Sequence, residues 1–148
     1  MSLPIDPSRI SEADLGEVQA TVALSHGEAI EHVREICLDE GFGVPVEFSP
    51  ADLLNEKVDA DRDPLYVLGA CNPDIANRCL EITPRMAALF PCNFIIREIE
   101  PDLQAIHHIS IMRIARLVGI APDSPEWEAI VEETGALVDA TYDRLQSD

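Results

Sequence analysis

The sequence is poor in basic residues. It has 10 Lys and Arg against 28 Asp and Glu among 148 residues, Lys57 is the only lysine, and the formal net charge is −18 at pH 7. Phosphate groups of nucleic acids are bound by clustered Lys and Arg, and no such cluster occurs here, so we expect no nucleic-acid partner. We interpret the carboxylates as a solvated surface. Their excess is like that of a halophile's protein, in which molar salt screens self-repulsion.

The sequence also lacks long apolar runs. Residues 1–10 contain neither a basic segment nor an apolar stretch typical of a signal peptide, and no run approaches the length of a membrane span. The four cysteines include no Cys-x-x-Cys pair, which argues against a zinc ribbon and a thioredoxin-type centre. We therefore expect a cytoplasmic protein with reduced thiols and no membrane partner.

Familiar catalytic and nucleotide-binding motifs are missing as well. There is no phosphate-binding loop with its lysine, no Rossmann glycine pattern and no His-Glu-x-x-His sequence, which disfavours an NTPase or a classical hydrolase. Asp59, Asp61 and Asp63 imitate the start of a calcium loop. Pro64 and Ala70 occupy the positions that need Gly and Glu, so we reject a calcium site there.

What is present is an alternation of strand and helix patterns. A hydrophobic content of 47% suits one domain, and we predict a loose lead-in at residues 1–16 followed by a single domain at residues 17–148. Strand patterns occur at residues 18–24, 44–48, 65–70, 94–99 and 103–109, and helix patterns lie between and after them. The predicted fold class is α+β: a mainly antiparallel sheet of about five short strands, with helices packed on one face.

Two segments with a Cys-Asn pair bracket the middle of the chain. Residues 69–73 read Gly-Ala-Cys-Asn-Pro, which predicts a strand that ends in a helix cap, and residues 91–93 read Pro-Cys-Asn before the next strand. A straight helix between them would carry Cys71 and Cys92 far apart. Pro84 breaks this helix pattern, and we favour two short helical pieces that fold back and bring both cysteines to one end of antiparallel strands.

These two segments resemble the signature of a family called domain of unknown function 302, and the likeness extends over residues 18–146. The resemblance implies a small α+β domain that is often homodimeric, with no established activity. In one departure from the family's pattern, residues 110–112 read Ser-Ile-Met where the family often has Asp-Pro after its last strand. This difference affects the expected local turn and leaves the Cys-Asn segments untouched.

Other polar and sulfur side chains are assigned to the core. Cys37 and Cys79 fall on apolar helix stripes and are interpreted as packing residues. His107 and His108 cannot easily share one metal ion, because successive strand residues point to opposite faces. We expect His107, which alternates with Leu103 and other apolar residues, to be a buried imidazole with its hydrogen bonds satisfied.

Two functions remain open on these residues. The favoured one is a non-enzymatic, homodimeric binding or regulatory domain whose site holds a small ligand or a metal ion. The ligand-binding residues would be Cys71, Asn72, Pro73, Cys92 and Asn93. The alternative is a thiol-dependent redox enzyme or sensor in which Cys71 attacks and Cys92 resolves. The identity of a ligand, metal or cofactor does not follow from the sequence.

Overall fold

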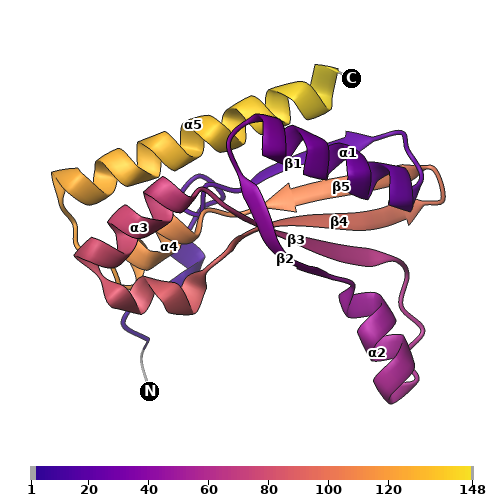
Figure 1. Ribbon diagram of the computed structural model, residues 1–148. Coiled ribbons are helices and arrows are strands. Elements are labelled where there is room, and N and C mark those ends of the chain that lie inside the picture. The colour runs from indigo at the N-terminus through magenta and orange to yellow at the C-terminus, as the bar shows by residue number, and fades with distance from the viewer. Residues whose placement is uncertain (1–2, 148) are drawn as a thin grey trace.

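The computed structural model describes residues 3–147 and shows a five-stranded antiparallel sheet flanked by helices (Figure 1). The order of strands across the sheet is β1-β5-β4-β3-β2, and every neighbouring pair is antiparallel. The predicted α+β fold is thereby confirmed. The strands are β1 (Val18–Val22), β2 (Gly43–Phe48), β3 (Leu65–Cys71), β4 (Cys92–Glu100) and β5 (Leu103–His108).

Four of the helices begin at a capping residue, and Asn72 is the cap that the sequence predicted. The side chains of Ser25, Ser49, Asn72 and Ser110 each accept a hydrogen bond from the backbone N–H three residues later, which satisfies one of the free donors of a first turn. The helices are η1 (Pro7–Arg9), α1 (His26–Asp39), α2 (Pro50–Val58), α3 (Pro73–Ile82), η2 (Pro84–Leu89), α4 (Ile111–Leu117) and α5 (Pro125–Ser147). Within residues 3–147, no helix combines the length and hydrophobicity needed to span a membrane.

Helices α1 and α5 cover one face of the sheet, as Figure 1 shows. The main core lies between them and the strands, and Cys37 belongs to it as predicted. Helices α3, η2 and α4 gather beyond the end of β3 and β4 and form a second core with α5, in which Cys79 is fully buried, also as predicted. Helix α2 stands apart from these helices and contacts β3 (Figure 1).

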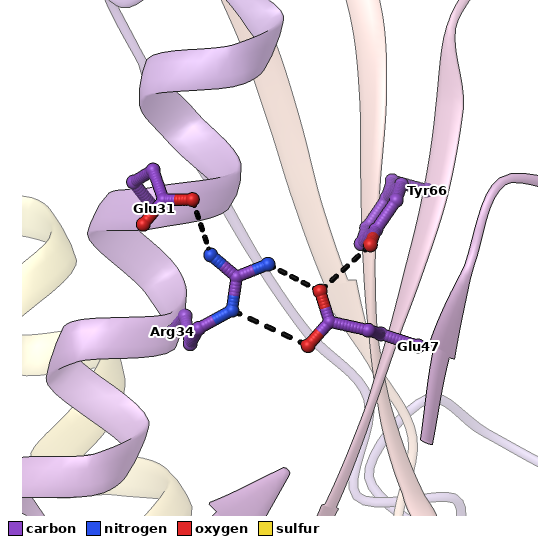
Figure 2. A network of polar contacts seen from close by, with 4 residues as sticks. All are labelled: Glu31, Arg34, Glu47 and Tyr66. Carbon is purple, nitrogen blue, oxygen red and sulfur yellow. Dashed lines mark hydrogen bonds and ion pairs between the residues drawn. The ribbon is translucent and has the colours of Figure 1, made fainter. Parts of the chain in front are cut away.

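A polar network ties α1 to the edge of the sheet (Figure 2). Arg34 of α1 forms a two-pronged ion pair with Glu47 of β2, and the hydroxyl of Tyr66 on β3 donates to the same carboxylate at 2.7 Å. Glu31, one turn before Arg34, contacts the other side of the guanidinium. The network lies on the covered face, where it satisfies polar groups that α1 would otherwise shield from water.

The two histidines of β5 point to opposite faces of the sheet, as predicted, but the buried imidazole is that of His108. The imidazole of His108 is buried on the covered face, while His107 is partly exposed on the other face and its Nε2 atom is buried without a hydrogen-bond partner. The prediction of a satisfied buried His107 was therefore wrong. Its alternation with apolar residues was real, but the apolar set that it shares lies on the uncovered face of the sheet.

Candidate functional site

The two Cys-Asn segments lie side by side, because β3 ends where β4 begins. Ala70 is paired with Cys92, and Gly69 is paired with Asn93. The connection between the strands is broken at Thr83 into α3 and η2, which allows it to fold back. The predicted antiparallel arrangement, with both cysteines at one end of the sheet, is confirmed.

Gly69 lets the two segments approach closely. A Cβ atom at this position would lie 2.6 Å from Cγ of Pro91 and 2.9 Å from the carbonyl oxygen of Val46, both well inside normal contact distance. The close packing of β3 against β2 and against Pro91, just before β4, therefore requires a glycine at this position. No bound ligand is needed to explain it.

Asn72 has a structural role in this junction. Its Oδ1 atom accepts from the backbone N–H of Ile75 at 3.0 Å, and its Nδ2 atom donates to the carbonyl oxygen of Gly41 at 3.1 Å. Pro73 occupies the first turn of α3, where its missing N–H costs nothing. These two residues join the end of β3 to the loop after α1.

A small cavity of about 20 Å³ lies between the segments. Cys71, Asn72 and Cys92 line it, whereas Pro73 and Asn93 do not. Such a volume accommodates about one water molecule or a group of similar size. The remaining lining residues are mainly apolar: Phe42, Ala70, Ile75, Ala76, Phe90, Pro91, Met112 and Thr134.

Comparisons with known proteins place this architecture in a family. The sequence matches the family described as "Domain of unknown function DUF302" over residues 18–145. The chain belongs to the DUF302 family. The resemblance seen in the sequence is thereby confirmed, and no curated protein matches the chain.

A solved structure supports the DUF302 fold. The crystal structure of an uncharacterized conserved DUF302 protein from Bacillus stearothermophilus aligns with 88% of this chain and 98% of that chain, with a TM-score of 0.75. The two sequences are 24% identical, so this similarity concerns the fold alone.

The thiols of this DUF302 chain are shielded from ionisation. Burial raises the pKa of the Cys71 thiol, and it raises the pKa of Cys92 to about 12, with a further contribution from the neighbouring Cys71 and Cys79. Burial likewise raises the pKa of Cys79 to about 11. Burial thus favours the protonated thiols at neutral pH, and a protonated thiol is a poorer nucleophile than a thiolate.

The site also offers few side chains that could bind a metal ion. Among residues 3–147, no three His, Cys, Asp or Glu side chains are grouped so that they could hold a metal ion. Cys71 and Cys92 are offset by one residue in the β3–β4 register, and a pair with this offset does not project its side chains directly opposite one another. The site brings the two cysteines into one neighbourhood without forming an evident metal centre.

Sequence reasoning missed His108 as a candidate functional residue. Its ring stacks on Phe94 with centroids 4.7 Å apart, and its Nδ1 atom lies 2.9 Å from the carbonyl oxygen of Asn93. Burial lowers the pKa of this imidazole. The position of Asn93 therefore matters through its backbone. The sequence indicated an antiparallel pair of residues 94–99 and 103–109, but it did not show which face of the second strand the helices cover.

Proposed function

We propose that this DUF302 chain is a non-enzymatic binding or regulatory domain that acts as a homodimer and takes a small ligand between its two Cys-Asn segments. The observation that carries this proposal is the cavity that both segments line, in which burial holds the thiols of Cys71 and Cys92 protonated. A neutral thiol contributes packing and weak hydrogen bonds, as a binding site requires, whereas thiol catalysis requires a thiolate.

The size and lining of the cavity limit what it can accept. A volume of about 20 Å³ admits one small group, such as a methyl or a carbonyl, so most of a ligand would lie outside, over Asn72 and Pro91. Pro73 and Asn93 would then shape the rim of the site. A soft metal ion is the weaker choice, because no three suitable donors are grouped among residues 3–147.

The homodimer is proposed to form through the uncovered face of the sheet. Val46 and Phe48 of β2 are 55% and 47% exposed there, next to the half-buried Val67 and Ile95. The chain has 28 acidic residues, but among the registered strand positions on this face only Glu100, opposite Leu103 at the β4–β5 turn, is acidic. Glu17 lies at the margin of the face beside His107, and Arg97 is a basic residue on it. A second copy, which carries the same −18 charge, can approach most closely over a surface that is mainly apolar and has few carboxylates.

The dimer is tested by light scattering of the full chain at working salt. Phe48→Glu places a carboxylate on the uncovered face at a side chain that is already half exposed, so it should produce a folded monomer. Leu38→Glu is the matched control, because Leu38 is 53% exposed on α1 and lies outside the proposed interface. A wild-type chain that stays monomeric at micromolar concentrations contradicts the homodimer.

One observation favours the alternative function, a thiol enzyme or redox sensor with Cys71 as attacking and Cys92 as resolving thiol. The two cysteines lie at the same end of neighbouring strands. Oxidation to a disulfide would release two electrons and two protons to an oxidant such as a peroxide. The raised pKa values of both thiols oppose this chemistry.

Thiol titration and metal analysis of one native sample separate the two functions. The binding domain predicts that both thiols react with a disulfide reagent more slowly than free cysteine, and that peroxide forms no Cys71–Cys92 disulfide. Rapid modification of Cys71 and disulfide formation, both lost in Cys71→Ser and kept in Cys37→Ser, would establish the redox function instead. Stoichiometric bound metal, lost in Cys71→Ser, would identify a metal as the ligand.

All four cysteines are free thiols in the structure. Unpaired cysteines are typical of a reducing compartment, which supports the proposal of a cytoplasmic location. Fractionation of the source cells with an antibody to the chain tests this location.

A further inference from the structure

A second, larger cavity lies beneath α5, at the end of β5 that is close to the lead-in segment. Its volume is about 160 Å³. Its polar lining residues are Glu17, His108, Ser110, Arg113, Thr134 and Asp139, and two glycine and three valine residues complete the wall. Thr134 also lines the small cavity between Cys71 and Cys92, so one residue of α5 separates the two spaces.

His108 presents a hydrogen-bond acceptor to this cavity. The imidazole is 2% exposed, and its Nδ1 atom lies 2.9 Å from the carbonyl oxygen of Asn93. A carbonyl oxygen only accepts, so Nδ1 carries the hydrogen and Nε2 has the lone pair. His108 is also one of the residues that line the cavity. Burial favours the neutral ring, which keeps this lone pair available.

Thr134 adds a hydroxyl without a partner. The residue is 4% exposed, and its Oγ1 atom has no hydrogen bond within residues 3–147. Thr141, two turns later on α5, is also buried, but its hydroxyl donates to the carbonyl oxygen of Leu137 at 2.9 Å. An unsatisfied buried hydroxyl is costly, and its position on a cavity wall indicates that something inside the cavity satisfies it.

The residues that line the cavity carry charges of both signs. Arg113 lies on one side, where its charge also acts on the carboxylate of Asp14. Glu17 and Asp139 contribute two carboxylates to the same lining. Anions and cations therefore both meet a like charge, and an uncharged molecule avoids this repulsion.

We propose that this cavity is a binding site for an uncharged, hydroxyl-bearing molecule of about the size of phenol. The ligand's hydroxyl donates to Nε2 of His108 and accepts from Oγ1 of Thr134, which gives the buried Thr134 hydroxyl the partner that it lacks. A dry cavity of about 150 Å³ in another protein accommodates benzene, so the volume here suits a six-membered ring. The site is separate from the cavity at Cys71 and Cys92 and does not depend on a ligand there.

The experiment is a titration of the full chain with phenol, followed through the imidazole nitrogen resonances of His108 in a histidine-labelled sample. We expect a saturable shift of the Nε2 resonance. Toluene, which fills the same volume without a hydroxyl, should bind at least about tenfold more weakly, and benzoate should be excluded to a similar degree. Equal binding of phenol and toluene would overturn the proposal, as would the absence of any His108 shift.

Two isosteric variants make the test specific. Thr134→Val should weaken phenol binding about tenfold while raising the unfolding midpoint of the free chain, because an unsatisfied hydroxyl is removed. Thr141→Val removes a satisfied hydroxyl from the same helix, so it should leave phenol binding unchanged and lower the midpoint. Wild-type phenol affinity in Thr134→Val would refute the site. Cys71→Ser should bind phenol normally, which keeps this result independent of the function proposed for the Cys-Asn segments.

Discussion

The two faces of the sheet treat polar groups differently. On the covered face, Gln104 is fully buried and its amide nitrogen donates to the carbonyl oxygen of Leu24, while Glu47 is held by Arg34 and Tyr66. On the uncovered face, the buried Nε2 atom of His107 has no partner within residues 3–147. Apart from the cavity beneath α5, where Thr134 Oγ1 has no partner, these polar groups of the covered face find partners within one chain, whereas the uncovered face has the properties of an unfinished interface.

The largest expected effect contrasts one phenylalanine from each face. Phe94 is fully buried, packs edge-to-face against Phe42 and stacks with His108 and Tyr142, so Phe94→Ala should lower the free energy of unfolding by about 3 to 5 kcal/mol. Phe48→Ala removes a ring that is 47% exposed and should cost the monomer about 1 kcal/mol or less. Urea unfolding of both variants at low protein concentration measures these two losses of free energy of unfolding. Equal losses would show that the two phenylalanines contribute alike to the stability of the monomer.

Local signals in the sequence were enough to predict the elements of the fold. Asn72-Pro73 and Ser49-Pro50 mark helix starts by capping and by the fixed φ of proline, and the structure begins α3 and α2 there. The orientation of β5 could not be predicted in the same way. Leu103, Ala105 and Ile109 suggested the core face, yet the helices cover Gln104, Ile106 and His108. Both alternating sets include apolar residues, and only the tertiary pairing decides which set α5 covers.

The location of the candidate site could be predicted from the sequence, but the roles of most of its residues could not. The break at Thr83-Pro84 correctly indicated that Cys71 and Cys92 meet at one end of the sheet. The roles of Gly69 and Asn72 in packing and capping depend on contacts with Pro91 and the loop after α1, which are distant in sequence. Thr134 was missed for the same reason, because a threonine in an amphipathic helix carries no sign that its hydroxyl is left unpaired.

Gly69 offers the next largest effect and tests how tightly the Cys-Asn segments are joined. Gly69→Ala would place a Cβ 2.6 Å from Pro91 and 2.9 Å from a backbone oxygen, so we expect a loss of about 2 to 3 kcal/mol. Gly27→Ala on α1 is the control, since a Cβ there meets nothing within 4 Å and alanine favours the helix. Thermal and urea unfolding measure both, and a Gly69→Ala chain as stable as wild type would show that the segments can separate freely.

The network in Figure 2 gives a smaller effect on the covered face. Arg34→Met should cost about 1 to 2 kcal/mol, because it leaves Glu47 partly buried without its cation. Arg62→Met, at an exposed arginine whose side chain forms no ion pair with the described residues, should change stability by less than about 0.5 kcal/mol. Urea unfolding of the two variants compares them. Equal effects would mean that the network does not hold α1 to the sheet.

Acid should distinguish the two histidines of β5. Burial lowers the pKa of His108 in the folded chain, so the unfolded chain binds more protons below its ordinary value of 6.5. Stability conferred by the neutral ring is thus present above that pH and is lost as the pH falls below it. The free energy of unfolding of wild type should fall between pH 7 and pH 5, and His108→Gln should flatten this slope more than His107→Gln does, because His107 is less buried. An unchanged slope in His108→Gln would contradict the assignment.

Salt should have the smallest effect per charge but should act on both the fold and the proposed interface. Raising potassium chloride from about 0.1 M to 1 M shortens the screening length from roughly 10 Å to 3 Å, which relieves repulsion among 28 acidic residues opposed by 10 basic ones. We expect the unfolding midpoint to rise by about 3 to 6 °C, or about 1 kcal/mol for a chain of this size.

Two chains of −18 charge also repel each other, so salt should tighten the dimer as well. The Phe48→Glu monomer separates these contributions. Its unfolding midpoint should still rise with salt, because repulsion within one chain is screened, but this rise should no longer depend on protein concentration. A midpoint that is flat or falling with salt in both proteins would show that the carboxylates are spaced widely enough not to interact.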